Sequence, residues 1–276
     1  MKKIVFLLAF FILLISTSFA QSKVGNYLGD ESRFYASTKQ INQFFRRFNA
    51  EEDPKGDRIY KGNKRYRNAK LRKKYIRVLF DNETSALDNT LKSIFINDVT
   101  GSNSKFLGFH KGKWFAEVHT VFNYKGKKET AILFLKIQEE PVGSKWVIDK
   151  VHFEPFNKLF NFDSTDTKTF IHPMSHELDF MNLHKAFRKK KEIEKYTSRS
   201  YRPDHLTLFL LEVKKSNLTF QSIKNVKFHF FQVDNWYFEL SEFNRGGHNT
   251  GWLISNLTKL NEQQKVSYKK FIYFEN

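Results

Sequence analysis

Apolar residues, alternating with polar ones at 114–124 and in short runs bounded by turns elsewhere, predict two sets of three β-strands along this chain. The predicted strands are 114–124, 130–138 and 145–153 in the first set, and 226–233, 236–243 and 251–257 in the second. Short turns separate neighbouring strands, such as Lys125-Gly126-Lys127 in the first set and Asp234-Asn235 in the second. Because such turns join antiparallel neighbours, each set is expected to form a meander.

Helical periodicity precedes each set of strands. In the segment from Thr38 to Asn49, Ile41, Phe44 and Phe48 recur at three- and four-residue spacings, which predicts an amphipathic helix. Further helices are expected at 69–79, 85–96 and 173–195, whereas 206–213 and 218–223 match neither period clearly. Helices followed by antiparallel strands predict the α+β class, with helices packed on curved meander sheets.

The last strands of the two sets share a short pattern. Residues 144–151 and 250–257 each contain a turn residue, a Trp, an aliphatic residue, an Ile, two polar residues and an aliphatic residue. A pattern repeated in this way favours two similar domains. The first is placed at 31–155 and the second at 173–276, with a polar linker at 156–172 between them.

Helices followed by long strands, the last one carrying Trp146 or Trp252, resemble the NTF2-like (cystatin-like) superfamily. The resemblance covers 37–153 and, more loosely, 173–260, and implies a bent sheet wrapped around a helix to form a cone. The superfamily includes enzymes and non-catalytic binders, and none of its catalytic sets can be matched to residues here. Exported tandem proteins of this kind are familiar in Bacteroidetes-type bacteria, and Asp163-Ser164-Thr165 is similar to the O-glycosylation acceptor used there.

Residues 1–20 have the features of a signal peptide. Lys2 and Lys3 precede an apolar run from Ile4 to Ile15, and Ser18-Phe19-Ala20 offers a cleavage site. The mature chain is expected to begin at Gln21, with no membrane span after cleavage, and to reside in the periplasm or at the cell surface. The chain has no Cys, so export brings no disulfide and a cysteine protease is excluded.

The chain is strongly basic, with 47 Lys and Arg against 29 Asp and Glu. The basic tract at 61–74 also contains tyrosines, and its candidate partner-binding residues are Lys70, Arg72, Lys73 and Lys74. A basic surface attracts polyanions, which makes an anionic envelope component, another envelope protein or nucleic acid the candidate partners. A solvated face without a specific partner is the competing interpretation.

Glu117 and His119 are the candidate catalytic pair. They share a strand face with Phe115 and could act as acid and base if that face lines a pocket; otherwise they are polar residues on a solvent face. A second cluster comprises His172, His176, His184, Glu177 and Asp179. Pro173 and the long helical spacing argue against a shared metal, so neither metal nor cofactor is predicted.

No Gly-x-Ser-x-Gly elbow, phosphate-binding loop or dinucleotide fingerprint is present, and Arg245-Gly246-Gly247 reads as a hairpin turn. The sequence thus favours an exported non-catalytic binding protein of the bacterial envelope, with an unknown ligand or partner. Two alternatives stay open. One is an enzyme with a cone-shaped pocket that uses Glu117 and His119, and the other is a binder of anionic glycan or nucleic acid through the tract at 61–74.

Overall fold

A computed structural model describes residues 40–53, 55–84, 87–159, 187–188, 190–198, 201–247 and 249–275. The predicted signal peptide, most of the predicted linker and most of the helix expected at 173–195 lie outside the described residues. Within them, no helix combines the length and apolar character needed to cross a membrane.

The protein is α+β and divides into two compact units that are interleaved along the sequence. The smaller unit comprises 1–86, 92–104 and 242–253, and the larger comprises 87–91, 105–241 and 254–276. Each unit therefore draws on both halves of the chain. The predicted division into domains at 31–155 and 173–276 is not confirmed.

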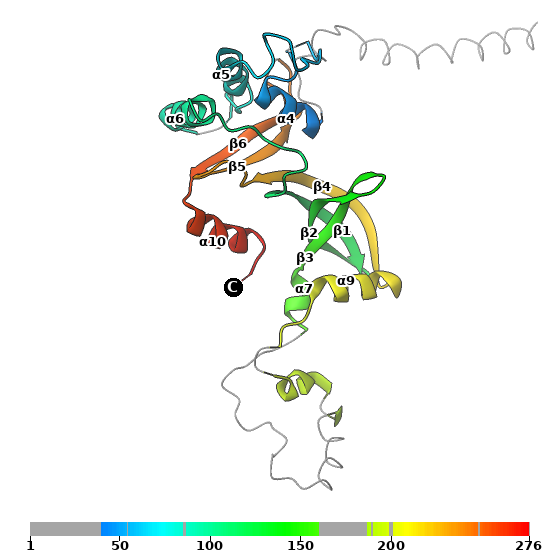
Figure 1. Ribbon diagram of the computed structural model, residues 1–276. Helices are drawn as coiled ribbons and strands as arrows, with labels where there is room; N and C mark the ends of the chain where they lie inside the picture. The colour runs from blue at the N-terminus through cyan, green and yellow to red at the C-terminus, as the bar shows by residue number, and fades with distance from the viewer. Residues whose placement is uncertain are drawn as a thin grey trace, which may run out of the picture. The chain divides into compact units, whose positions relative to one another are not determined.

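Six strands of the described residues form one antiparallel sheet that is not closed, in the order β3-β2-β1-β4-β5-β6 (Figure 1). The strands are β1 (Trp114–Tyr124), β2 (Lys127–Glu140), β3 (Gly143–Phe153), β4 (Leu218–Phe230), β5 (Trp236–Phe243) and β6 (Gly251–Lys259). Both predicted meanders are present. They join because β1 pairs with β4, which places Trp114 opposite Phe230.

Strand β4 differs most from expectation. The sequence pattern does not distinguish helix from strand at 218–223 and predicts a strand at 226–233. In the structure a single strand runs from Leu218 to Phe230. Its register against β1 shifts opposite His119/Thr120 and again opposite Val121/Phe122. Such irregularities interrupt the alternation of side chains, so the period of two is lost although the strand continues.

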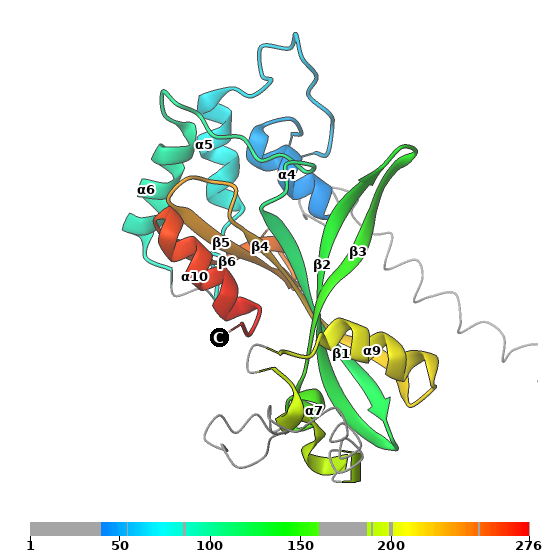
Figure 2. The same ribbon diagram turned by 60° about the horizontal axis from the view of Figure 1, so that its bottom comes forward.

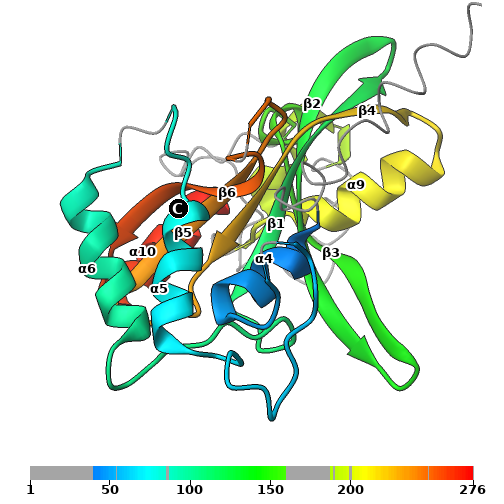
Figure 3. The same cartoon turned by 90° about the horizontal axis from the view of Figure 1, so that it is seen from above.

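Helices pack on both faces of the sheet in the larger unit (Figure 3). Helix α9 (His205–Lys214) begins at its N-cap Asp204 and packs Phe209 against Phe122 of β1, with ring centroids 5.2 Å apart. Helix α10 (Glu262–Ile272) packs on the other face, where Tyr268 contacts Tyr237 of β5. The larger unit also contains two short elements, α7 (Glu154–Asn157) and the 3₁₀ helix η2 (Lys190–Tyr196).

The smaller unit contains the helices α4 (Ile41–Asn49), α5 (Ala69–Val78) and most of α6 (Asn89–Thr100) (Figure 2). Phe48 and Phe80 both contact Phe95 of α6 in the buried core. Helix α6 begins later than the predicted position 85, because the Asp88 carboxylate accepts bonds from the first backbone amides, those of Thr90 and Leu91.

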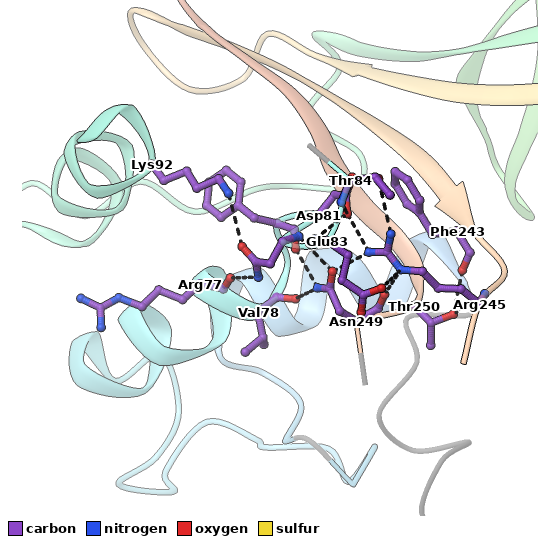
Figure 4. Close-up of polar contacts among 12 residues, drawn as sticks. Arg77, Val78, Asp81, Glu83, Thr84, Lys92, Phe243, Arg245, Asn249 and Thr250 are labelled. Carbon is purple, nitrogen blue, oxygen red and sulfur yellow. Dashed lines mark hydrogen bonds and ion pairs between the residues drawn. The ribbon is translucent and has the colours of Figure 1, made fainter. Parts of the chain in front are cut away.

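The loop between β5 and β6 is fastened to the segment after α5 within the smaller unit (Figure 4). The Arg245 guanidinium donates to Asp81 Oδ1 at 2.6 Å and to the Asn249 backbone oxygen at 2.7 Å. The Asn249 amide in turn donates to the backbone oxygen of Phe80 at 2.7 Å. The interpretation of Arg245-Gly246-Gly247 as hairpin chemistry is confirmed, with Gly247 at a φ of 95° that favours glycine.

Candidate functional site: a polar cleft in the larger unit

Polar side chains from three strands meet on one face of the sheet in the larger unit. In an antiparallel sheet, directly opposed residues point to the same side. His229 of β4 lies opposite Phe115 of β1 and opposite Glu239 of β5. Because residues two apart on a strand share a face, Glu117 and Tyr237 point to the same side as His229.

These side chains form one continuous hydrogen-bonded chain, which we call the floor chain: Glu117, His229, Tyr237 and Glu239. Glu117 Oε2 lies 2.8 Å from His229 Nε2, and His229 Nδ1 lies 2.8 Å from the Tyr237 hydroxyl. That hydroxyl also lies 3.5 Å from Glu239 Oε2. All four side chains are largely buried, and His229 and Tyr237 almost completely.

The structure brings the two candidate catalytic residues together. His119 Nε2 lies 2.5 Å from Glu117 Oε1, so the Glu117 carboxylate is held between His119 and His229. Glu117 lines the cleft described below, whereas His119 contacts Glu117 from outside the lining. The predicted pair is therefore part of a larger network.

Hydrogen bonding determines where the protons of the floor chain reside. Burial alone would raise the pKa of the Glu117 carboxyl, but hydrogen bonds and charge from His229 and His119 outweigh it and lower that pKa. An ionised carboxylate only accepts, so His229 Nε2 must donate to Glu117. Burial raises the pKa of Tyr237, which therefore stays protonated and donates to either His229 Nδ1 or Glu239.

Glu239 anchors the other end of the floor chain. Its Oε1 lies 3.2 Å from Lys227 Nζ of β4 and accepts a bond from Ser255 Oγ of β6 at 3.3 Å. The chain of contacts thus extends across four neighbouring strands, β1, β4, β5 and β6. Buried polar networks of this kind are rigid when every member has its partners.

The floor chain lies at the bottom of a cleft of about 1520 Å³ in the larger unit. Its lining comes from the floor chain, from α10 and the residues after it, and from β3, α7 and the start of α9. Acidic residues outnumber Lys and Arg in this lining, although the whole chain carries a net charge of +18. The acidic lining residues are Glu117, Asp149, Glu154, Asp204, Glu239 and Glu275; the basic ones are Lys150, Arg202 and Lys270.

Aromatic side chains line the cleft on the α10 side. Phe271 and Phe274 are more than half exposed. The Phe274 ring stacks on the His152 imidazole of β3, with centroids 3.8 Å apart. Burial lowers the pKa of His152, which leaves a neutral imidazole at the cleft wall at neutral pH. The cleft combines acidic groups with flat apolar surfaces.

The basic tract lies in the smaller unit and needs one correction. Lys70, Lys73 and Lys74 are exposed on α5, as expected, but Arg72 is fully buried. Its guanidinium donates to the backbone oxygens of Phe48 at 3.2 Å and Val99 at 3.0 Å, near the carboxyl ends of α4 and α6. Burial lowers the pKa of Arg72 to about 10, so it remains charged at neutral pH. Arg72 therefore joins helices and is not part of a docking surface.

No cluster suited to a metal ion occurs among the described residues. The cluster of His172, His176 and His184 with Glu177 and Asp179 lies outside them.

Sequence reasoning missed His229, Tyr237 and Glu239. A signal was present, because each polar group interrupts an apolar strand: His229 stands between Phe228 and Phe230, and Glu239 between Phe238 and Leu240. Joining them to Glu117 required the pairing of β1 with β4, which connects residues more than a hundred positions apart.

Comparison of the chain with protein-family models, with curated proteins and with solved structures gives no match.

Proposed function

We propose that this protein is an exported, non-catalytic binding protein of the bacterial envelope, and that the cleft in its larger unit receives a small polar ligand. The observation that carries the proposal is a cleft of about 1520 Å³ whose floor is a buried, fully bonded polar chain. Concave sites with a few fixed polar groups among aromatic side chains are typical of ligand sites.

The bonding of the floor chain favours binding over acid–base catalysis. A general base must reach the substrate proton with its basic atom. Here each Glu117 oxygen has a histidine partner, and His229 Nδ1 has Tyr237. His229 Nδ1 has a single lone pair, so proton transfer to it from a substrate would first have to break its bond to Tyr237.

The charge of the lining indicates the kind of ligand. Lys150 pairs with Glu275 and Asp149 with Lys136. Within the described part of the chain, Glu154 and Asp204 have no lysine partner: Glu154 lies 3.9 Å from His152, and Asp204 caps α9. An excess of carboxylates favours ligands that donate hydrogen bonds or carry positive charge. Aromatic rings such as Phe271 add attraction for cations through their faces. We therefore expect amines or amino sugars to bind better than carboxylic acids of similar size.

Two substitutions at neighbouring exposed positions of α10 test the cleft. Ser267 lines it, whereas Val266 does not. Ser267→Trp should fill the cleft, and Val266→Trp adds the same bulk outside it. Native mass spectrometry would compare binding of L-arginine, spermidine and glucosamine with that of L-glutamate and galacturonate. Amines should bind the wild type and Val266→Trp but not Ser267→Trp; equal binding to all three proteins would contradict the proposal.

The acid–base enzyme is the second candidate, because Glu117 and His119 are in contact and Glu117 reaches the cleft. The candidates differ in the result of Glu117→Gln. For an enzyme this variant would bind a substrate and fail to convert it. For a binder it should weaken the floor chain and lower affinity together with stability.

Export and the fold family belong to the same proposal. Residues 1–20 support export through their charged, apolar and small-residue order, and amino-terminal sequencing of the cell-produced protein should begin near Gln21. Two similar NTF2-like halves are supported by the strand order, in which β3 with Trp146 and β6 with Trp252 occupy the two outer positions of the sheet.

A further inference from the structure

We propose that the smaller unit carries a separate docking surface for acidic polysaccharide, formed by the outer face of α5 and the loop before it. We call it the lysine face and define it by Tyr60, Lys61, Lys64, Lys70, Lys73, Lys74 and Arg77. It does not depend on the cleft, and its ligand has the opposite charge.

The charge of this segment is one-sided. Residues 58–77 contain ten Lys or Arg residues and no Asp or Glu. Intervening acidic residues usually moderate a basic surface, but here none lies within the segment itself. Such a concentration of one sign creates a local positive potential that draws in polyanions.

Three arginines of the segment serve the fold, whereas most of its lysines do not. Arg65 lies 3.4 Å from Asp53, and Arg67 lies 2.6 Å from Glu51. Arg72 is buried against backbone oxygens. Within the described residues, by contrast, no ion pair or hydrogen bond involves the ammonium groups of four exposed lysines: Lys61, Lys64, Lys70 and Lys74.

Helix α5 arranges part of the lysine face in a row. Lys70, Lys73, Lys74 and Arg77 are exposed and follow the spacing i, i+3, i+4 and i+7 of one helix face. They extend over about 10 Å of helix length at the usual rise per residue. A row of this kind can contact successive acidic groups of an extended polymer.

Arg77 in the last turn suits the helix dipole, but the positions of Lys70 and Lys74 do not favour helix stability. The first turn of α5 has no acidic residue and contains Lys70, although the amino end of a helix favours negative charge. Lys70 and Lys74 also lie four residues apart, where like charges repel. Charges that lower the stability of a helix are expected where a binding function requires them.

Burial of the apolar side of α5 favours an acidic polymer over a lipid membrane as the partner of the lysine face. Tyr75 and Ile76 are buried in the core of the smaller unit and cannot insert into lipid, which leaves Val78, at 58 % exposure, as a single small apolar side chain at the end of the helix. The exposed ring beside the cations is Tyr60, at 68 % exposure, which provides a flat apolar surface next to Lys61. A sugar polymer with acidic groups uses both features, since its rings can lie on the aromatic face while its charges meet the lysines.

A four-site charge reversal tests the proposal. Lys61, Lys64, Lys70 and Lys74 would be replaced by Glu, and the matched control would reverse four exposed lysines of the larger unit: Lys127, Lys128, Lys214 and Lys215. The two variants have the same net charge. Binding to dextran sulfate and polygalacturonate would be measured at low and at physiological salt, with uncharged dextran as reference.

The lysine-face variant should lose at least tenfold in affinity for both acidic polymers, and the control less than threefold. Binding of the wild type should also weaken with salt, because exposed charges are screened. Equal losses in the two variants would overturn the proposal. So would tighter binding of the wild type to phosphatidylglycerol vesicles or to oligo-dT than to either polysaccharide.

Lys70→Glu provides a second readout that separates binding from folding. This change places an acid in the first turn of α5, so the melting temperature should stay the same or rise while polysaccharide affinity falls. A lower melting temperature would show that Lys70 serves the fold and would overturn its assignment to the lysine face.

Discussion

Arg245 and Asp81 form an ion pair across 164 positions of sequence, with the guanidinium nitrogen 2.6 Å from Oδ1 (Figure 4). Asp81 is almost fully buried in the smaller unit, and Thr84 also bonds to its carboxylate. Burial raises the pKa of Asp81, but hydrogen bonds from Thr84 and Arg245 outweigh it and lower that pKa to about 2. The pair fastens the β5–β6 loop to the segment after α5.

Replacing Asp81 by Asn should destabilise the protein by about 2 kcal/mol at neutral pH, the value that corresponds to its lowered pKa. Because the folded-state pKa lies below the unfolded one, this contribution is complete above about pH 4 and is lost as the pH falls towards about 2. Urea unfolding of the wild type and Asp81→Asn at several pH values would measure the difference.

Glu83→Gln is the matched control for this prediction. Glu83 also lies near Arg245, at 3.3 Å, but its side chain is 52 % exposed. Exposed ion pairs contribute about 0–1 kcal/mol, so this variant should unfold almost like the wild type. A stability difference for Asp81→Asn that is independent of pH would contradict the assigned pKa.

The buried position of Arg72 makes a second prediction. Arg72→Ala leaves the backbone oxygens of Phe48 and Val99 without their donor and opens space between three helices. Lost hydrogen bonds to a buried charged group and lost packing should together cost about 3 kcal/mol. Lys74→Ala on the exposed side of the same helix should change stability by less than about 0.5 kcal/mol. Similar values for the two variants in denaturant melts would refute the burial of Arg72.

Removal of the Tyr237 hydroxyl tests the floor chain. Tyr237→Phe keeps the ring but leaves His229 Nδ1 without its partner, which should cost about 1–3 kcal/mol. Tyr60→Phe, which removes a hydroxyl from an exposed ring, should have no measurable effect on unfolding. If Tyr237→Phe left the free energy of unfolding unchanged, water would have replaced the hydroxyl, and the floor chain would not be continuous without it.

The two tryptophans of the outer strands should respond differently to truncation. Trp252 is buried, and Trp252→Ala should cost about 3–5 kcal/mol through lost burial and the cavity left behind. Trp146 is 39 % exposed and contacts Trp114 edge-on, so Trp146→Ala should cost about 1 kcal/mol. Equal losses for the two variants in urea melts would contradict these positions.

Local patterns predicted the individual elements well. The predicted strands 114–124 and 236–243 coincide with β1 and β5, because alternation in the first and the short turn before the second mark their bounds directly in sequence. The pairing of β1 with β4 could not be read in this way, since it depends on contacts between distant segments. Without it, the two meanders were assigned to separate domains, whereas their strands share one sheet.

Sequence could predict only those residues of the candidate site that lie close together along the chain. Glu117 and His119 are two positions apart on one strand, so alternation placed them on one face. His229 and Tyr237 come from other strands, and only the sheet register brings them to Glu117. Arg72 was misplaced for a related reason: a basic side chain within a basic tract reads as solvated, and the carbonyl groups that bury it belong to two other helices.

The most direct test of the account is histidine-ring NMR of the larger unit's cleft in the full chain, with and without glucosamine, spermidine or L-arginine. In the free protein, His229 should show a proton on Nε2 that exchanges slowly with water. Adding an amine that binds should shift the His229 and His152 signals and leave those of exposed His110 unchanged. Shifts confined to His110, or a His229 proton that exchanges freely with water, would contradict a ligand cleft built on the floor chain.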